Sequence, residues 1–397
     1  MAVPRNLCAT ARARGTSTPA ITTAAREARE ALGDAPVAFG LLFVSPTADL
    51  ASALRAVRAS AGTDAVIGCT TAGEIAADGL AHGGAVVLLV AGDVTARLAF
   101  ASGVGSRPEE VATALAQGLA EAKREAHARG HRHATSLLLT DGLTGTAERV
   151  LEALYEARVQ TATQIVGSAA ADESAFRATW VGGGDEVGRD AAAVLHLFGA
   201  SAWGVGVGHG LAPTTKQMRV TRAKDNVVLE LDGEPAFAVY QRHAAERGVV
   251  LRPENAPAYM MSHELGVHFF ERVSRARAPL SVREDGALVC AAEVPQGSMV
   301  SIVSGEADGI VAAARSAAEE ALARLEGRKA AGVVLFDCVC RGSMLGPSFG
   351  REVDAVRAVF GDVPLAGFLT YGEIARRPGH HQEGWHNATA VVVAIPA

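Results

Sequence analysis

One pattern occurs three times along the chain and limits what it can fold into. Each copy reads as an apolar strand, a helix, a second strand, a loop and a closing strand. The copies span residues 37–91, 135–200 and 330–395. Their opening strands are continuous apolar runs, which is typical of strands covered on both faces. Self-similarity at this spacing indicates one supersecondary unit used three times.

The helix of each copy has one apolar face. In the first copy this face comes from Leu50, Leu54 and Val57, at the spacing of one side of a helix. A helix that joins two strands of one sheet predicts a right-handed crossover and parallel pairing. The closing strand follows only a loop, so we expect it to pair antiparallel. The sequence thus predicts an α/β fold of repeated strand–helix–strand–strand units that form layered mixed sheets covered by helices.

The region between the second and third copies has a different character. Residues 201–296 carry short strand patterns with Asp-Gly and Asn turns, which predict hairpins. Residues 297–325 read as a strand and a long Ala-rich helix, which we interpret as a fourth, weaker unit. Gly204, Gly206 and Gly208 alternate along one stretch and predict a bare strand face suited to close packing.

The domain division follows from where the second unit closes. We place it near residue 200, which predicts two related domains over residues 1–200 and 201–397. Residues 1–23 are rich in Ser, Thr, Ala and Arg. We expect them to form a loose arm.

Composition and charge exclude several classes of protein. The chain has 37 Lys and Arg against 43 Asp and Glu, a net charge of −6, so it lacks the basic surface of a nucleic-acid-binding protein. No apolar run reaches the roughly 20 residues of a membrane span, and the N-terminus has no secretory core. Five cysteines, an odd number in a long chain, argue against a disulfide framework. We expect a cytoplasmic protein with reduced cysteines, no membrane span and no nucleic-acid partner.

Certain residues recur when the units are aligned on Gly68, Gly167 and Gly367. A glutamate follows six residues later in each unit, and the first and third units also share a threonine, a glycine and a histidine. These residues are Glu74, Glu173 and Glu373, then Thr71 with Thr370, Gly73 with Gly372, and His82 with His386. A carboxylate after a strand meets a ligand at the sheet edge, or caps a loop by accepting backbone N–H bonds. Both interpretations stay open.

Polar residues gather in the third unit. Arg341 follows its first strand, Tyr371 and Glu373 follow its second, and His386 and Asn387 precede its third. Ends of neighbouring parallel strands lie about 5 Å apart, so we expect Arg341, Tyr371 and Glu373 to line one pocket with the other two at its rim. Arg341 would grip a carboxylate and Glu373 an ammonium. This predicts an amino-acid-like ligand, unless Arg341 and Glu373 simply pair with each other.

Catalytic and metal signatures are missing from the sequence. There is no P-loop, no G-x-S-x-G elbow and no H-E-x-x-H. Cys338 and Cys340 are two apart, but a second pair that would complete a metal site is lacking. We therefore expect no catalytic residues, no metal and no cofactor.

Several motifs in order resemble the FIST family of sensory modules. They are IGCTTAGEI at 67–75, LLLTDGL at 137–143, VGHGLAP at 207–213, LELDGEPAFAVY at 229–240, LFDCVCRG at 335–342, PLAGFLTYGEI at 364–374 and HNAT at 386–389. The resemblance implies a FIST N-type first domain, a FIST C-type second domain and a small-molecule ligand. In the second unit, however, Asp172 stands where the family pattern has glycine. The motif positions that carry over are Gly73, Glu74, Cys338, Arg341, Tyr371, Gly372, Glu373 and Asn387.

Three functions remain open from the sequence. The first is a stand-alone sensor that binds an amino-acid-like ligand and signals to a partner protein in trans. The second is a thiol-dependent acyl transferase or hydrolase that uses Cys338. The third is a scaffold that binds proteins and no ligand. A pocket with convergent charges favours the first, and a histidine beside the Cys338 sulfur favours the second.

Overall fold

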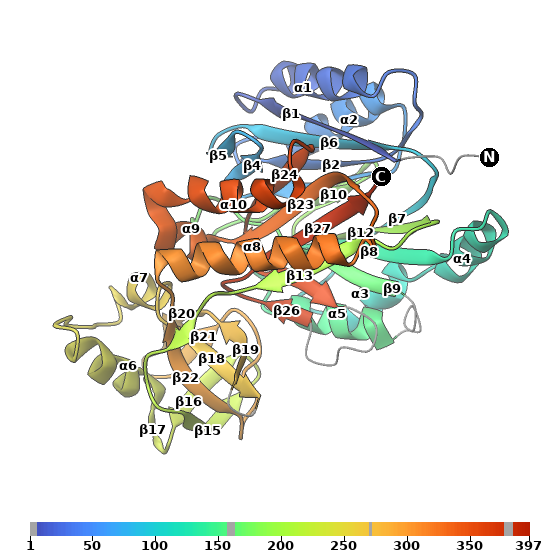
Figure 1. The fold of residues 1–397 in the computed structure, drawn as a ribbon. Coiled ribbons are helices and arrows are strands. Elements are labelled where there is room, and N and C mark those ends of the chain that lie inside the picture. The colour runs from blue at the N-terminus through green and yellow to red at the C-terminus, as the bar shows by residue number, and fades with distance from the viewer. Residues whose placement is uncertain (1–5, 157–162, 270–271, 377–383) are drawn as a thin grey trace.

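The structure, a computed structural model, describes residues 6–156, 163–269, 272–376 and 384–397. These residues form three six-stranded sheets and one nine-stranded sheet (Figure 1). Each six-stranded sheet is built around one repeat unit, and the nine-stranded sheet lies in a segment inserted into the third unit. The fold is α/β with mixed sheets and covering helices, as the sequence predicts.

The first unit starts earlier than the repeat in the sequence. Its elements are β1 (Leu7–Ala13), α1 (Thr18–Ala31), β2 (Val37–Val44), α2 (Leu50–Ala61), β3 (Val66–Thr70), β4 (Glu74–Ala76), β5 (Gly79–Ala81) and β6 (Ala85–Ala91). β1 pairs antiparallel with β6, and the Ser17 hydroxyl accepts the Ala20 N–H at the start of α1. The expected loose arm is therefore wrong for residues 6–23, while residues 1–5 lie outside the described part. The sequence of this strand, LCATARA, has only one large apolar side chain, so it lacks the alternation of apolar and polar residues that predicts a strand.

The second unit repeats this order. Its elements are β7 (Val94–Ser102), α3 (Pro108–Leu115), α4 (Leu119–Ala128), β8 (His133–Thr140), α5 (Ala147–Glu156), β9 (Thr163–Ala169), β10 (Val181–Gly183), β11 (Glu186–Gly188) and β12 (Ala191–Gly199). An early strand, β7, again pairs antiparallel with the closing strand, β12.

The third unit is interrupted by the inserted domain. Its elements are β13 (Gly204–Gly208), α8 (Ala307–Ala323), β23 (Ala330–Cys338), α9 (Val339–Leu345), the 3-10 helix η1 (Gly346–Ser348), α10 (Gly350–Phe360), β24 (Leu365–Thr370), β25 (Glu373–Arg376), β26 (Gly384–His386) and β27 (Ala390–Pro396). β13 and α8 correspond to the early strand and helix of the other units. The fourth unit expected at 297–325 is therefore wrong, because its helix completes the third unit.

The inserted domain forms between β13 and α8. Its elements are β14 (Ala212–Pro213), β15 (Met218–Lys224), β16 (Val227–Leu231), β17 (Glu234–Pro235), α6 (Ala236–Ala245), α7 (Ala256–Met260), β18 (Glu264–Phe269), β19 (Arg272–Arg277), β20 (Pro279–Val282), β21 (Leu288–Cys290) and β22 (Met299–Ser304). Hairpins β15–β16 and β20–β21 lie where the sequence predicts them. No helix in the described residues is long and apolar enough to cross a membrane.

Strand pairing inside the units follows the prediction. The two strands joined by a helix are parallel in each unit, β2 with β3, β8 with β9 and β23 with β24. The closing strands β6, β12 and β27 pair antiparallel with the first of these two strands. Gly68, Gly167 and Gly367 occupy the same register, opposite Leu42, Leu138 and Leu335. All three lie within strands and not at turns. Glycine is needed there because the carbonyl oxygen of the neighbouring strand leaves no room for a Cβ.

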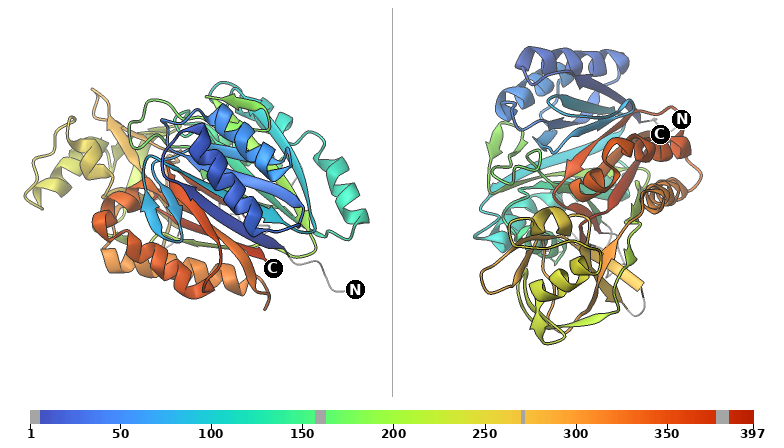
Figure 2. Two further views of the ribbon diagram at one scale, coloured as in Figure 1. Left: turned by 90° about the horizontal axis from the view of Figure 1, so that it is seen from above. Right: turned by 90° about the vertical axis from the view of Figure 1, so that its left-hand side faces the viewer.

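The hairpin that follows the second parallel strand leaves its own unit. The first unit's β4–β5 pairs with β24 of the third, the second unit's β10–β11 pairs with β3 of the first, and the third unit's β25–β26 pairs with β9 of the second. Each sheet is thus completed by a neighbour in a closed cycle. Figure 2 shows the three sheets around a common centre with their helices outside.

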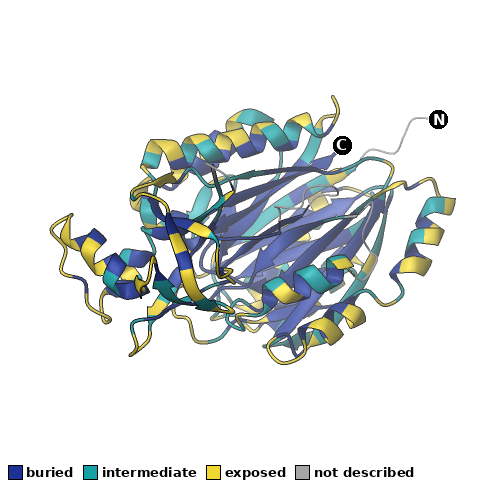
Figure 3. Ribbon diagram, turned by 90° about the horizontal axis from the view of Figure 1, so that it is seen from below, coloured by how far each residue is buried: buried dark blue, intermediate teal, exposed yellow. Residues whose placement is uncertain are grey.

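The centre between the three sheets is apolar. Phe43 of the first unit contacts Phe336 and Phe368 of the third, with ring centroids 6.2 Å and 4.6 Å apart. Leu137 and Val166 of the second unit belong to the same buried cluster. Alternate residues such as Leu42 face α1 and α2 instead. Both faces of these central strands are covered, which explains their continuous apolar runs, while the outer helices present an exposed face (Figure 3).

Helix α8 packs directly on the glycine face of β13. A Cβ at Gly204, Gly206 or Gly208 would overlap the carbonyl oxygens of Ala321, Ala317 or Ala313. The prediction that this stripe serves close packing is confirmed. Alanines on α8 allow the same approach from the other side.

We expect Gly367→Ala to destabilise the protein by about 3 kcal/mol or more, because its Cβ would overlap the backbone carbonyl of Leu335. Gly350 is the matched control, since no atom lies within 4 Å of an added Cβ there. Gly350 is the first residue of α10, so Gly350→Ala should change the unfolding free energy by less than about 1 kcal/mol. Urea unfolding followed by circular dichroism measures both. Equal midpoints for the two variants would contradict the role given to Gly367.

Candidate functional site

The ends of parallel strands from different units meet beneath the inserted domain. β23 ends at Cys338, and Tyr371 follows the end of β24. Gly142, just beyond β8 of the second unit, lies so close that its Cβ would be 3.1 Å from the Tyr371 ring. Ligands in α/β proteins bind outside such carboxyl ends. A small pocket lies at this junction.

The pocket combines residues from two units and the inserted domain. Its lining consists of Gly142, Phe176, Met261, Ala278, Leu280, Ala291, Cys338, Val339, Cys340, Tyr371 and Asn387. Three of these, Cys338, Tyr371 and Asn387, are predicted from the sequence. The pocket has a volume of about 20 Å³, which is room for about one water molecule.

The chain turns from strand to helix directly at Cys338. Cys338 is the residue before α9, and Cys340 and Arg341 already lie in the helix. The expectation that Arg341 directly follows the third unit's first strand is therefore wrong. The turn nevertheless brings both thiols to the pocket, where they are 2% and 3% exposed.

Cys338 has surroundings that favour a negative charge. Burial raises the pKa of its thiol, but hydrogen bonds from the Cys340 side chain, the N–H groups of Cys340 and Ala388, and the Glu373 carboxyl lower this pKa to about 7 overall. The same hydrogen bond from Cys340, together with burial, raises the pKa of the Cys340 thiol well above its usual value. At neutral pH the pair is therefore poised between two thiols and one thiolate with one thiol.

The second unit shows what this position accepts. Strand register places Asp141 where the third unit has Cys338, and Ser45 is the matching residue of the first. The Asp141 carboxylate accepts the N–H of Asp190 at 2.7 Å. Asp190 and Ala388 both have a positive φ, 51° and 50°, just before the closing strand. One backbone N–H thus meets a carboxylate in one unit and a sulfur in the other.

Glu373 is fully buried and bonded within the protein. It accepts the Thr370 hydroxyl at 2.6 Å and the Thr389 N–H at 3.2 Å. Burial, and then the charge of Cys338, raise the pKa of its carboxyl well above the usual value. Glu373 is therefore a neutral hydrogen-bond donor to the Cys338 sulfur at neutral pH.

Glu74 has the same arrangement in the first unit. It accepts the Thr71 hydroxyl at 2.5 Å and the Gly84 N–H at 3.1 Å, and burial raises its pKa to about 7. Gly73 before it has a φ of 144°. These two residues lie on the hairpin that pairs with β24 and not at the pocket of Cys338. The loop-capping interpretation accounts for their contacts.

Glu173 is not the counterpart of these glutamates. In register with Glu74 and Glu373 the second unit has Val181, because residues 172–180 form an extra loop before β10. Glu173 lies in that loop and accepts the Ser45 hydroxyl at 2.8 Å. The spacing of six residues from Gly167 to Glu173 therefore matches the other units in sequence but not in structure.

Two predicted residues lie behind the pocket. His386 pairs with Glu373 across the β25–β26 hairpin, and burial, followed by the charges of Arg275 and Arg277, lowers its pKa to about 3. A Cβ at Gly372 would overlap the Trp385 ring. Asn387 lines the pocket, and among the described residues its amide makes two long contacts, 3.4 Å to the Tyr371 carbonyl and 3.5 Å from the Ala278 N–H. Long contacts such as these leave the amide able to bond a ligand.

Arg341 is bonded entirely within the protein among the contacts that the structure describes. Its guanidinium lies 3.0 Å from Asp337 and contacts Glu352, and all three side chains have no exposed surface. It also donates to the carbonyls of His209 at 2.7 Å and Ile310 at 3.0 Å. Burial and the neighbouring Glu352 raise the pKa of Asp337, so one carboxyl of this cluster keeps a proton. Arg341 joins the third unit's helices and does not pair with Glu373.

A loop from the second unit closes the pocket. Residues 172–180, the Asp172 loop, place the Phe176 ring on the Tyr371 ring at 4.5 Å and nearly parallel. The Asp172 carboxylate accepts the N–H groups of Phe176, Arg177 and Ala178 and the Tyr371 hydroxyl. Phe176 is nonetheless 40% exposed. Sequence analysis missed this loop, whose one signal was the departure of Asp172 from glycine.

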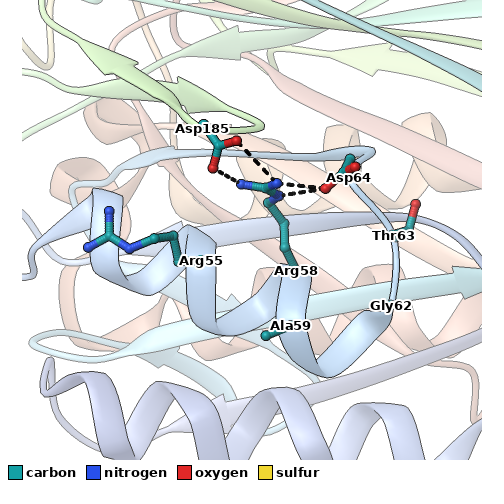
Figure 4. Close-up of a pocket in the computed structure, with 7 residues that line it drawn as sticks. All are labelled: Arg55, Arg58, Ala59, Gly62, Thr63, Asp64 and Asp185. Atoms are coloured by element: carbon teal, nitrogen blue, oxygen red, sulfur yellow. Dashed lines mark hydrogen bonds and ion pairs between the residues drawn. The ribbon is translucent and has the colours of Figure 1, made fainter.

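Two other hollows lie on the surface. One, of about 460 Å³, lies beside α2, where Arg58 already bridges Asp64 and Asp185 while Arg55 points away (Figure 4). The other is a cleft of about 990 Å³ between α5 and the inserted domain. There Glu148 pairs with Arg275 and Arg277. Within the described residues no group of three or more His, Cys, Asp or Glu side chains is placed to hold a metal.

Comparison with protein families identifies the class. The model of the FIST N domain matches residues 38–234, and that of the FIST C domain matches residues 236–376. The chain belongs to the FIST family. FIST domains are sensory and signal-transduction modules that bind small ligands. The domain division at residue 200 stays a prediction.

Other comparisons add little. No curated protein matches the chain. Among solved structures, a cyanuric acid hydrolase from A. caulinodans matches 49% of this chain and 71% of its own at 11% identity, with a TM-score of 0.31. That likeness is too distant to support an argument.

We expect Arg341→Met to destabilise the protein by about 3–5 kcal/mol, because it leaves Asp337 and Glu352 buried without their cation. Arg351→Met is the control, since Arg351 pairs with Asp308 at the surface and such pairs contribute about 0–1 kcal/mol. Urea unfolding at pH 7 gives both values. If the Arg341→Met protein were as stable as the unchanged protein but failed to bind ligand, Arg341 would be a ligand-binding residue and not a structural one.

Proposed function

We propose that this protein is a cytoplasmic sensor that binds an amino-acid-like ligand at the Cys338–Tyr371–Asn387 pocket and signals to a partner protein in trans. The observation that carries the proposal is the small pocket at the strand ends, partly covered by the Phe176 ring from a separate loop. The family supplies the general role of a small-ligand sensor.

The chemistry of the pocket suits the two ends of such a ligand. The Cys338 thiolate would attract an ammonium group. The Asn387 amide can donate to a carboxylate, a role first given to Arg341, whose protein partners occupy it. The Tyr371 ring offers a flat apolar face, and burial and Asp172 raise the pKa of its hydroxyl, which stays protonated.

Ligand entry requires the Asp172 loop to move. The cavity of about 20 Å³ is far smaller than an amino acid. Glu173, Ser174 and Phe176 in the loop all have a positive φ, between 51° and 64°, and such backbone costs about 1 kcal/mol or more per residue. This strain lowers the free energy needed to open the loop. Opening would also move Phe176 and Trp180, each 40% exposed, and so change a surface that a partner can read.

A thermal-shift screen against amino acids, related amines and carboxylates tests the proposal, because a ligand of the folded state raises its melting temperature. For a ligand so found, we expect Asn387→Ala to weaken binding roughly 10- to 100-fold by calorimetry, the cost of a hydrogen bond to a charged group. Asn255→Ala, at an exposed turn of the inserted domain, should bind normally. If no compound shifts the melting temperature, or if both variants bind alike, this site is wrong.

A second candidate is acyl transfer by Cys338, favoured by a thiol pKa of about 7. The groups that hydrogen-bond its sulfur include a carboxyl, that of Glu373, which is neutral and cannot act as a base. We expect p-nitrophenyl acetate or a thioester to give a stoichiometric burst that Cys338→Ser abolishes and Cys290→Ser keeps, if this chemistry occurs. No burst above that of Cys338→Ser removes the candidate.

A further inference from the structure

The two pocket thiols have a chemistry that ligand sensing does not use. Cys338 and Cys340 share a hydrogen bond and both line the cavity. Residues two apart at a bend have Cα atoms about 5.5–7 Å apart, which overlaps the span of a disulfide. The strand-to-helix turn at Cys338 has already directed both sulfurs to one point. The pair is thus arranged to react within itself.

The strand register and the second unit's contacts also mark the Cys338 position as suited to an anion. The equivalent residue of the second unit is Asp141, and the same positive-φ position donates its N–H in both units. The protonated carboxyl of Glu373 donates a further hydrogen bond to the Cys338 sulfur. Thiolates and not thiols attack oxidants, so this position supplies the reactive form.

The size of the cavity selects the oxidant. About 20 Å³ holds roughly one water molecule, and hydrogen peroxide is the small oxidant closest to water in size. Bulky disulfides are excluded while Phe176 covers Tyr371. We propose that Cys338 and Cys340 form a dithiol that hydrogen peroxide oxidises to an intramolecular disulfide.

The reaction balances in two steps. The Cys338 sulfur attacks one peroxide oxygen, an S–O bond forms as the O–O bond breaks, and the released hydroxide takes a proton from a neighbouring carboxyl to give water. The Cys340 thiol then loses its proton to that carboxylate and attacks the Cys338 sulfenic acid, so that an S–S bond replaces the S–O bond. The second hydroxide takes a proton from solvent and leaves as water. The two sulfurs lose two electrons, and the peroxide gains them.

A neighbouring acid suits the proton transfers. Glu264 is fully buried, its carboxyl contacts the Cys340 sulfur, and its oxygens have no nitrogen or oxygen partner among the described residues. Burial raises the pKa of Glu264 well above its usual value. Glu264 and Glu373 therefore lie beside the two sulfurs as proton carriers. The other cysteines lack this setting, since burial raises the pKa of Cys69 and Cys8 and raises that of Cys290 to about 12.

Mass spectrometry tests the proposal directly. Trypsin releases residues 330–341 as one peptide that contains both cysteines. After brief treatment of the reduced, folded protein with stoichiometric hydrogen peroxide, this peptide should be lighter by two hydrogen atoms. It should react roughly tenfold faster than the Cys290 peptide, and its rate should rise with pH around 7, where the thiolate forms.

Variants separate the two steps. Cys340→Ser should stop at a sulfenic acid on Cys338, which dimedone traps when it is added as the protein is unfolded in urea. Cys338→Asp, which copies the second unit, should fold and leave Cys340 reduced, and Cys290→Ser should behave as the natural chain. Phe176→Ala should raise the reaction rate with the bulky reagent DTNB roughly tenfold while changing the peroxide rate little.

Two results would overturn the proposal. One is a 330–341 peptide that stays reduced in the folded protein while the urea-unfolded chain oxidises. The other is oxidation of all five cysteines at one rate. Neither readout uses the sensor's ligand, so a failed ligand screen and a failed oxidation remain distinguishable.

Discussion

The cyclic exchange of hairpins between the three units is the constraint on which this structure depends. No unit completes its own sheet, because the edge beside its second parallel strand pairs with a hairpin from another unit. Removing one hairpin would expose the edge of one sheet and the apolar centre around Phe43 and Phe368. The three units therefore fold as one body, although each has the local pattern of an independent domain.

The exchange also explains where the pocket lies. Hairpins that cross between units bring the parallel strand ends together, so Cys338, Tyr371 and Gly142 meet although they are far apart in sequence. Two of the three crossings carry a buried glutamate at their first residue. Glu74 and Glu373 each accept a threonine hydroxyl and the N–H before a closing strand. Their recurrence reflects this structural role.

Local features of this fold could be predicted from the sequence, whereas features set by distant pairing could not. The parallel pairs, the bare glycine face of β13 and the hairpins of the inserted domain follow from period, propensity and glycine spacing. The exchange leaves no such signal, since a hairpin has the same sequence whichever sheet it joins. Glu173 aligned with Glu74 and Glu373 in sequence only, because the extra loop at residues 172–180 shifts the register of the second unit. Arg341 was placed wrongly because the strand turns into a helix at Cys338. Asn387 and Tyr371 were found because they border strand ends, while Phe176 reaches the pocket from another unit.

The three units differ at the strand end where Cys338 lies. At the same position the first unit has Ser45, whose hydroxyl bonds Glu173, and the second has Asp141, whose carboxylate is held by backbone N–H groups. Both side chains are hydrogen-bonded to their neighbours. Among the three units, only the third has a thiol at this position, with a second thiol two residues on and a cavity in front. The donors that satisfy a carboxylate in one unit stabilise a thiolate in another, so the architecture needed for stability also prepares the chemistry of the pocket.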